Sequence, residues 1–351
     1  MEKDKNRALL KNSNKKRNIV EALVIFFLFL SAAFSISYWA IAKYDVYSDY
    51  TACGDAQQYI KMSRHDYSNV QQRYRNRPLM PFIVSLLNDH LKIDNFLNKY
   101  YENVENKIIQ LNFGIVNILA IALTALLFFY YCIYLNFSKW ESLVGSFLFL
   151  TSFFVVTYFT IPMVDSLSAF FIMAGFYAVL RSSLLGLSLS FLLGVFTKET
   201  TFVILPLILL EERRLFTKKL LVCLPGIISY IIFVIFFQDK ADATFYIFKD
   251  VVKILKGNFI QVSMREFSFY TLIENIQIFM FLWILFIYAL FKCKKPVFLK
   301  RVVWLLIIPV FTPLLPGAVV GRAVFYLFPI VIPFALLALR DILVSKVKEN
   351  Y

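Results

Sequence analysis

A set of charged side chains has the types that acid–base chemistry and phosphate binding require. Carboxylates accept protons from hydroxyl groups, and cations stabilise negative charge that develops on phosphate oxygens. The set consists of Asp55, Arg75, Arg77, Asp165, Lys198, Glu199 and Arg322. If the fold brings these residues into one site, they suit the transfer of a group from an anionic lipid carrier.

Several members of the set also have a purely structural interpretation. Asp55 opens the stretch Asp-Ala-Gln-Gln, and an acidic residue with a glutamine three positions later is typical of a capping box. Asp165 precedes the apolar run 167–180 and fits a helix N-cap. Lys198 and Glu199 fit a structural ion pair. The sequence leaves these alternatives open.

The remaining cations have similar alternatives. Arg322 fits an anchor for the last apolar segment at a membrane interface. Arg75 and Arg77 fit nonspecific contacts with lipid head groups. His65 and His90 lie near them in sequence, but two isolated histidines make a poor metal site, so no metal ligand is assigned.

The composition indicates that these residues are held by a membrane protein. The chain has 351 residues, of which 60% are hydrophobic, with 39 Phe and 20 Tyr. Its mean hydropathy is +0.67. A soluble domain has about 45–50% apolar residues. Lipid is therefore the natural solvent for this much apolar surface.

The formal net charge of +14 does not indicate nucleic-acid binding, because the basic residues form short clusters between apolar runs. The positive-inside rule explains such clusters as cytoplasmic segments. The cysteines, Cys53, Cys132, Cys223 and Cys293, match no zinc or redox spacing and imply no disulfide framework. The first apolar run follows a basic head without a small-residue cleavage site, so we expect a retained helix rather than a signal peptide.

Apolar runs of sufficient length predict a single all-α domain over residues 1–351, a polytopic transmembrane bundle of about ten helices. The expected spans are 20–42, 109–135, 142–160, 164–180, 182–197, 200–210, 220–237, 272–291, 302–316 and 323–339.

The stretch 182–210 decides the topology, since Lys198 and Glu199 interrupt it. Two short helices that meet at this pair place more Lys and Arg on the cytoplasmic side than one long span does. Both termini are then cytoplasmic, with a basic tail at 1–18. Because eleven helical residues reach only about 16 Å, the turn at the pair must lie in a recessed, protein-lined cavity.

Two long outer loops follow from this topology, at 43–108 and 238–271. Within them, the apolar periodicity of 93–104 and 245–255 predicts amphipathic helices in the membrane interface. Packing of these helices on the protein itself explains the pattern equally well. The same topology places the whole charged set at the extracytoplasmic side.

The sequence resembles the GT-C class of membrane glycosyltransferases, especially bacterial relatives of the protein O-mannosyltransferase and aminoarabinose-transferase group. The resemblance lies in the stretches Gly54-Asp55-Ala56-Gln57-Gln58-Tyr59-Ile60, Arg77-Pro78-Leu79-Met80-Pro81-Phe82, Gly194-Val195-Phe196-Thr197-Lys198-Glu199 and Gly321-Arg322-Ala323-Val324-Phe325-Tyr326-Leu327-Phe328-Pro329. The order of features matches along most of the chain. Leu79 stands where the family has a second proline.

The resemblance implies a bacterial inner-membrane enzyme that moves a sugar from a polyprenyl-phosphate donor to a glycan, lipid or protein acceptor. Asp55 would be the general base. Lys198 and Arg322 would bind the donor phosphate, together with Arg75 and Arg77.

The remaining acidic residues take supporting roles in this hypothesis. Glu199 would position Lys198. Asp165 would orient the acceptor, or bind a divalent cation such as Mg²⁺ or Mn²⁺ if one is used.

Other functions fit a membrane protein with charged residues in a recessed site. A lipid-linked saccharide flippase or another secondary transporter would also have broken helices near a cavity, but with internal repeats that the sequence does not show. A polysaccharide polymerase would also have large outer loops. A noncatalytic scaffold gives no reason for recessed charges at Lys198 and Glu199.

Overall fold

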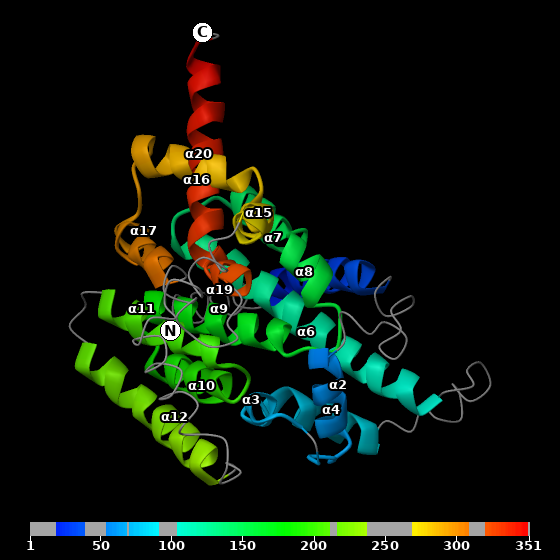
Figure 1. Cartoon of the computed structure of the whole chain (residues 1–351). Helices are drawn as coiled ribbons and strands as arrows, with labels where there is room; N and C mark the ends of the chain where they lie inside the picture. The colour runs from blue at the N-terminus through cyan, green and yellow to red at the C-terminus, as the bar shows by residue number, and fades with distance from the viewer. Residues whose placement is uncertain are drawn as a thin grey trace, which may run out of the picture.

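The computed structural model contains only helices in the part of the chain that it describes. The described ranges are 19–38, 54–68, 70–90, 104–210, 216–236, 269–308 and 320–349. Within them the regular elements are α-helices and short 3-10 helices, and no strand occurs. Figure 1 shows the helices packed into one body, from which the C-terminal part of α20 projects. The predicted all-α class is therefore confirmed for these residues.

Three described helices are long and apolar enough to cross a membrane, which is consistent with a membrane protein. They are Ile19–Tyr38, Ile108–Tyr134 within α6 (Val104–Tyr134) and Thr217–Phe236 within α12 (Phe216–Phe236). The other apolar helices are shorter. The count of about ten spans, made from hydropathy, remains a prediction.

The predicted span 142–160 is not one helix, because it divides into α7 (Lys139–Leu150) and α8 (Phe153–Tyr158). Ser152 between them has extended backbone. The Ser152 hydroxyl donates to the Phe149 carbonyl at 2.7 Å, a local bond that competes with helix continuation.

The predicted span 272–291 is also divided. It consists of α15 (Phe269–Phe279) and α16 (Leu282–Lys292). Met280 between them has φ 44°, a left-handed conformation that ends a helix. Hydropathy did not show either break, since apolar residues continue through both.

The region around Lys198 has the two-helix arrangement. After α9 (Asp165–Arg181) the chain turns at Ser182, and α10 (Leu184–Val195) runs back along α9. The 3-10 helix η1 (Glu199–Val203) and α11 (Ile204–Leu210) follow the break. One continuous span through 182–210 is therefore excluded.

The remaining described elements are short, apart from the last helix. The segment predicted as the first outer loop, 43–108, contains α2 (Gly54–Ser63), α3 (Gln72–Arg75) and α4 (Leu79–His90). The C-terminal part contains α17 (Val297–Val302), η3 (Val303–Ile307), α19 (Val320–Phe325) and α20 (Phe328–Glu349). The amphipathic helices expected at 93–104 and 245–255 lie outside the described residues, apart from Val104.

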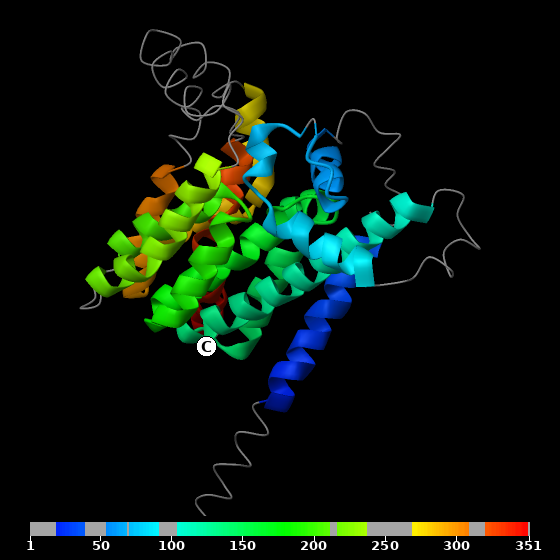
Figure 2. The same ribbon diagram turned by 90° about the horizontal axis from the view of Figure 1, so that it is seen from below.

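Packing centres on α9, which lies between α6 and α10, while α12 covers α10 on its far side. The α7 helix packs on α6 and on α20, and α20 packs against α16. Phe29 anchors the helix Ile19–Tyr38 at the edge of this bundle through edge-on contacts with Phe129 and Phe147 (Figure 2). A separate hydrophobic cluster joins α2 and α4 to α6 and α9.

The helix directions give the bundle two chemically different ends. The first half of α6 lies beside the start of α9, since Asn117 contacts Ser166, and Tyr131 further along α6 contacts Phe176. The two helices therefore run in parallel. Asp165 lies at one end of the pair, and Arg181 lies at the other.

The Arg181 end carries one exposed and one half-buried ion pair. Lys139 pairs with Glu21, and Arg340 Nε lies 2.5 Å from Glu141 Oε1. These contacts bring the beginnings of the first helix and of α7 together with the middle of α20. Ser138 caps α7 in a complete capping box with Glu141, which the sequence analysis did not identify.

Candidate functional site

Lys198 forms a buried polar cluster with Asp165 and Tyr326 at the other end of the bundle. Lys198 Nζ lies 2.6 Å from Asp165 Oδ1, and the side chains are 7% and 1% exposed. Tyr326 Oη donates to the same carboxylate oxygen at 2.8 Å. Lys198 Nζ also lies 3.4 Å from Tyr326 Oη and 5.3 Å from the centre of its ring. Three segments far apart in sequence therefore meet at one ammonium group.

The helix break after α10 directs the Lys198 side chain towards this cluster. The Gly194 carbonyl accepts the backbone N–H of Lys198 at 3.0 Å and the Thr201 hydroxyl at 3.0 Å. Lys198 itself is extended, with φ −166° and ψ 143°. Because consecutive side chains on extended backbone point to opposite faces, Lys198 and Glu199 leave the chain in different directions.

Glu199 pairs with Arg77 of the first outer loop. Arg77 Nη2 lies 2.9 Å from Glu199 Oε2, and Arg77 Nε donates to the same oxygen at 3.0 Å. Arg77 Nη1 donates to the Tyr59 hydroxyl at 3.0 Å. The Leu79 N–H donates to the Phe196 carbonyl at 3.1 Å, which ties the start of α4 to the helix break. The loop and the break are thus joined by both backbone and side-chain bonds.

Asp55 joins the same group through tyrosines. The Tyr74 hydroxyl donates to Asp55 Oδ1. The Tyr74 ring meets the Tyr59 ring edge-on, with centroids 5.4 Å apart, and the Arg77 guanidinium lies 6.0 Å from the Tyr74 ring centre. A chain of contacts therefore runs from Asp55 to the Arg77–Glu199 pair.

The ionisation of the Tyr59–Arg77 contact follows from burial and charge. Burial raises the pKa of Tyr59 above its usual range. The charge and hydrogen bond of Arg77 lower this pKa, whereas the charges of Asp165 and Glu199 raise it further. Burial alone would lower the pKa of Arg77, but the Glu199 charge and the Tyr59 contact outweigh it and raise that pKa. Tyr59 therefore stays a neutral hydroxyl and Arg77 a cation at every physiological pH.

The structure corrects the predicted role of Glu199. Glu199 was expected to position Lys198, and the two were also considered as a structural ion pair with each other. The partner of Lys198 is Asp165, and the partner of Glu199 is Arg77. The physical reason is the extended backbone at Lys198, which separates two side chains that are adjacent in sequence.

The capping interpretations of the two aspartates are also wrong. Val164 is the N-cap of α9, so Asp165 is the first residue inside that helix. Its carboxylate is bonded to the side chains of Lys198 and Tyr326, which belong to other segments. The Gln58 side chain accepts the backbone N–H of Gln71 at 3.0 Å instead of closing a capping box with Asp55.

Two further predicted residues are described only in part. Arg75 ends α3, and its half-buried side chain lies two residues from Arg77. Arg322 lies in α19, one turn before Tyr326, but its side chain is outside the described residues. The structure therefore brings together Asp55, Arg77, Asp165, Lys198 and Glu199, and leaves the contribution of Arg322 as a prediction.

Polar side chains behind the cluster fix the position of Asp165. Asn117 on α6 donates to the Ile161 carbonyl at 2.7 Å and accepts a hydrogen bond from the Ser166 hydroxyl. The Ser168 and Thr200 hydroxyls lie 3.1 Å apart, which links α9 to η1. Buried hydrogen bonds of this kind hold the start of α9 against both neighbouring elements.

The carboxylates do not fit a divalent metal. Among the described residues, no three His, Cys, Asp or Glu side chains converge on a point where they would hold an ion. The Asp165 carboxylate that would be the central ligand is 2.6 Å from a lysine ammonium. A lysine ammonium in this position repels a second cation and therefore opposes the binding of a divalent metal ion at Asp165.

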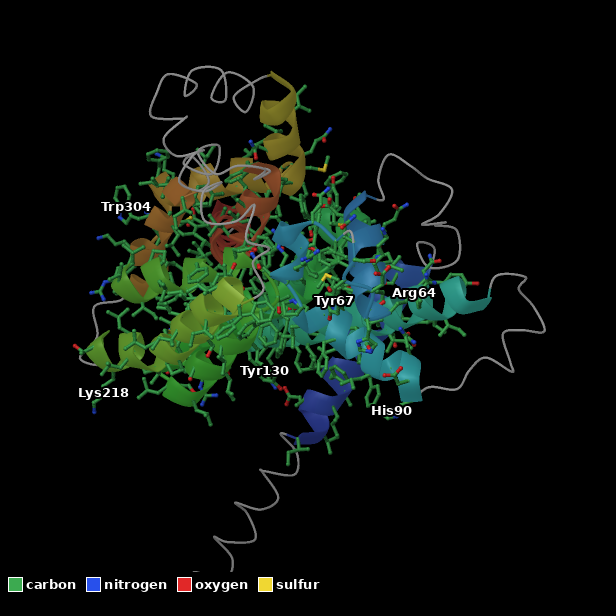
Figure 3. All side chains as sticks on the ribbon, turned by 60° about the horizontal axis from the view of Figure 1, so that its bottom comes forward. Arg64, Tyr67, His90, Tyr130, Lys218 and Trp304 are labelled. Carbon is green, nitrogen blue, oxygen red and sulfur yellow. The ribbon has the colours of Figure 1, made fainter. Side chains whose placement is uncertain are left out.

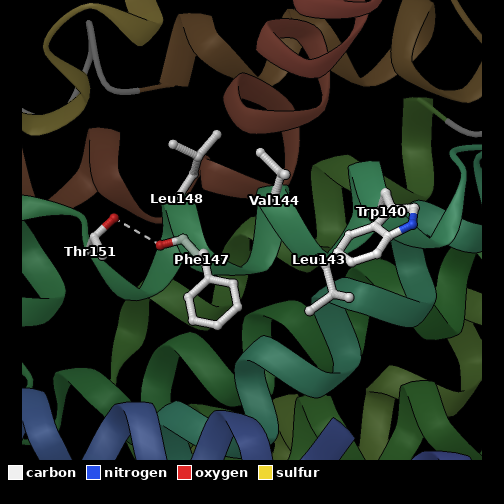
Figure 4. Close-up of a pocket in the computed structure, with 6 residues that line it drawn as sticks. All are labelled: Trp140, Leu143, Val144, Phe147, Leu148 and Thr151. Atoms are coloured by element: carbon white, nitrogen blue, oxygen red, sulfur yellow. Dashed lines mark hydrogen bonds between the residues drawn. The ribbon is translucent and has the colours of Figure 1, made fainter.

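An apolar hollow on α7 is unrelated to this cluster. It has a volume of about 270 Å³ (Figure 4) and is lined by Trp140, Leu143, Val144, Phe147, Leu148 and Thr151. The Thr151 hydroxyl donates to the Phe147 carbonyl at 2.8 Å. With no charged side chain in its lining, this surface suits contact with lipid chains rather than chemistry.

The residues that the sequence analysis missed are tyrosines. Tyr59, Tyr74 and Tyr326 bond to Arg77, Asp55 and Asp165 respectively. In a chain with 20 Tyr, single tyrosines carry little signal. The spacing from Asp55 to Tyr59, which is one helical turn, is a pattern that could have indicated a shared helix face.

Figure 3 shows the outer-loop helices, marked by Arg64 and Tyr67, on the opposite side of the view from Lys218 and Trp304.

Compared with protein-family models, curated proteins and solved structures, the chain matches none. Fold and site thus define a class: an all-helical protein with apolar helices of membrane-spanning length and a buried charged cluster at one end.

Proposed function

We propose that this chain is a membrane glycosyltransferase of the GT-C type, which transfers a sugar from a polyprenyl-phosphate donor to an acceptor hydroxyl at the extracytoplasmic face. The observation that supports it best is the meeting of Lys198, Asp165 and Tyr326 beside the Arg77–Glu199 pair. Ion pairs at membrane depth are costly and are usually functional.

The topology supports the extracytoplasmic position of this site. The opposite end of the bundle carries Lys139 and Arg340 near the beginning of the first helix. Clusters of Lys and Arg mark the cytoplasmic side of membrane proteins. The site end would then face away from the cytoplasm.

In the proposed reaction Asp55 is the general base. It takes the proton of the acceptor hydroxyl as that oxygen forms a bond to the sugar C1. The bond between C1 and the phosphate oxygen breaks, and its electron pair stays on the polyprenyl phosphate. One displacement of this kind inverts the anomeric centre. The Tyr74 hydroxyl, which donates to Asp55, orients the carboxylate.

Lys198 stabilises the charge that grows on the leaving phosphate. The Lys198 ammonium offers N–H donors to its oxygens, and Tyr326, whose single O–H is donated to Asp165, holds the ammonium in place. Asp165 positions Lys198, a role that differs from the acceptor binding expected from the sequence. Glu199 holds Arg77, whose planar guanidinium can donate N–H groups to phosphate oxygens.

The base is tested by comparing Asp55→Asn with Asp66→Asn. Asp66 belongs to the same segment, is exposed, and bonds the nearby Ser68, so it is a matched control. The purified protein is reconstituted with a panel of polyprenyl-phosphate sugars and an envelope fraction as acceptor, and release of polyprenyl phosphate is measured. Asp55→Asn should reduce the rate at least about 100-fold, whereas Asp66→Asn should not.

The same assay separates the alternatives. If Asp55→Asn retains the wild-type rate, Asp55 is not the base. If the sugar lipid moves between leaflets without release of polyprenyl phosphate, the protein is a transporter and the proposal is wrong.

A further inference from the structure

A second hollow combines apolar walls with basic side chains, at the end of α11 that is remote from Lys198. It encloses about 500 Å³ between α11 and the α17–η3 segment. The lining consists of Leu209, Leu210, Val297, Lys300, Arg301 and Trp304. Nothing in the proposed transfer reaction uses these residues.

The spacing of the lining residues explains why they share one surface. Val297, Lys300, Arg301 and Trp304 are separated by three, one and three positions, which places them on one face of a helix. The opposite face of the segment is anchored by Phe298, Leu299, Val302 and Leu305, all buried in the main hydrophobic cluster.

The exposed face is strongly amphipathic. Val297 is 65% exposed, Trp304 is 61% exposed, and Leu209 across the hollow is 59% exposed. Lys300 is exposed and Arg301 half-buried between these apolar groups. A surface in contact with water seldom has such large apolar side chains around two cations. Such a surface usually binds a partner that has both apolar and anionic groups.

We propose that this hollow binds an anionic phospholipid. Lys300 and Arg301 contact the phosphate of the head group, and an acyl chain lies along Leu209, Leu210 and Trp304. Charge complementarity selects the negative head group, and exposed tryptophan is the side chain most typical of the level where head groups meet acyl chains. This inference does not depend on the proposed transferase activity.

The position of the hollow fits this occupant. The apolar helix α11 ends at Leu210, and the exposed Lys218 lies in the first turn of α12 on the same side of the view as Trp304 (Figure 3). The phosphates of a membrane lie level with the ends of apolar helices, where a basic surface can bind them. A free phosphate ion would leave the apolar walls exposed to water.

The test compares the double variant Lys300→Gln, Arg301→Gln with the control Lys292→Gln, Lys294→Gln. The control residues are exposed and belong to the same basic stretch, but they do not line the hollow. Each full-length protein is purified in a neutral detergent. Native mass spectrometry then measures the binding of phosphatidylglycerol and of phosphatidylcholine with the same acyl chains.

We expect the wild type and the control to bind phosphatidylglycerol in preference to phosphatidylcholine. The double variant Lys300→Gln, Arg301→Gln should lose roughly fivefold or more in phosphatidylglycerol affinity. Equal binding of both lipids by the wild type, or equal loss in both variants, would overturn the proposal. Displacement of the lipid by inorganic phosphate alone would identify an ion site instead. Thermal unfolding of each variant shows that it is folded, and Lys300→Gln alone replaces the double variant if that one unfolds.

Discussion

At the scale of residues, burial separates the charged groups of this protein into two kinds. Asp165 and Lys198 are almost fully buried, whereas the Glu141 and Arg340 side chains are 25% and 39% exposed. A buried pair depends on its partner, because a single charge left in a low-dielectric interior is strongly destabilising. A partly exposed pair contributes little to the free energy of unfolding, and its contribution depends on pH. The two kinds predict different responses to mutation.

Lys198→Met should destabilise the protein by about 3–5 kcal/mol, because it leaves the Asp165 carboxylate buried without its cation. The double variant Asp165→Asn, Lys198→Met should recover much of that loss, since it buries no charge. Thermal unfolding in detergent measures the stability, and polyprenyl-phosphate release measures the activity. The double variant should stay inactive. Recovery of activity together with stability would show that the pair is only structural.

The Glu141–Arg340 pair predicts a pH-dependent stability. The Arg340 hydrogen bond is the largest cause that lowers the pKa of Glu141 to about 2, against the effect of burial, with further help from Ser138. A lowered folded-state pKa stabilises the fold above the unfolded value of 4.5. That contribution is lost as the pH falls from 4.5 towards 2.

Unfolding of the wild type and of Glu141→Gln at several pH values tests this contribution. After allowance for solvent screening, the difference in stability should be about 1 kcal/mol at pH 6 and should shrink below pH 4.5. A difference that stays constant down to pH 3 would mean that the charge of Glu141 does not act through this pair.

At the scale of elements, the break between α10 and η1 is the feature that builds the site. Gly194 makes it possible, because a Cβ there would lie 2.4 Å from Thr201 Cγ2 and 3.0 Å from Phe171 Cβ. Its carbonyl accepts the Lys198 N–H and the Thr201 hydroxyl. The glycine therefore allows the returning chain to approach α10 closely enough to aim Lys198 at Asp165.

Gly194→Ala should destabilise the protein by about 1–3 kcal/mol through overpacking and should reduce transfer activity, because the turn that carries Lys198 must shift. Adding Thr201→Ser removes the methyl group that clashes and keeps the hydroxyl, so it should restore part of both. Gly54→Ala is the stability control, since a Cβ at Gly54 meets nothing within 4 Å. Equal melting temperatures for the alanine variants at 194 and 54 would contradict the close approach.

At the scale of the whole molecule, the arrangement has two ends with different charged groups. Asp165, Lys198 and the helices α2 to α4 lie at one end, and the Lys139–Glu21 and Arg340–Glu141 pairs lie at the other. The parallel course of α6 and α9 and the return of α10 produce this separation. A membrane that contains the bundle would therefore place the two groups on opposite surfaces.

Labelling of single cysteines tests which surface is which. Arg64 and Lys218 are both exposed and lie on opposite sides of the molecule (Figure 3). In a background with the native cysteines replaced by serine, Arg64→Cys should react with an impermeant maleimide in intact cells. Lys218→Cys should react only after the membrane is permeabilised. The reverse pattern would place the charged cluster in the cytoplasm and would rule out the proposed face.

The sequence predicted the elements better than their ends. Long apolar runs identified the helices Ile19–Tyr38, α6 and α12, because membrane-length hydropathy is a sum over many residues. The breaks at Ser152 and Met280 were missed, because each depends on one residue's backbone conformation within a continuous apolar run. The break at Lys198 was found, since two charges marked it.

For the site, the sequence by itself determined which residues were candidates, because charged side chains inside apolar runs are costly and therefore conspicuous. Only the tertiary structure decided their partners. Lys198 pairs with Asp165 rather than with Glu199, and Glu199 pairs with Arg77. Partner choice depends on the directions in which side chains leave the backbone and on contacts between residues that are 33 and 122 positions apart, which local sequence patterns do not encode.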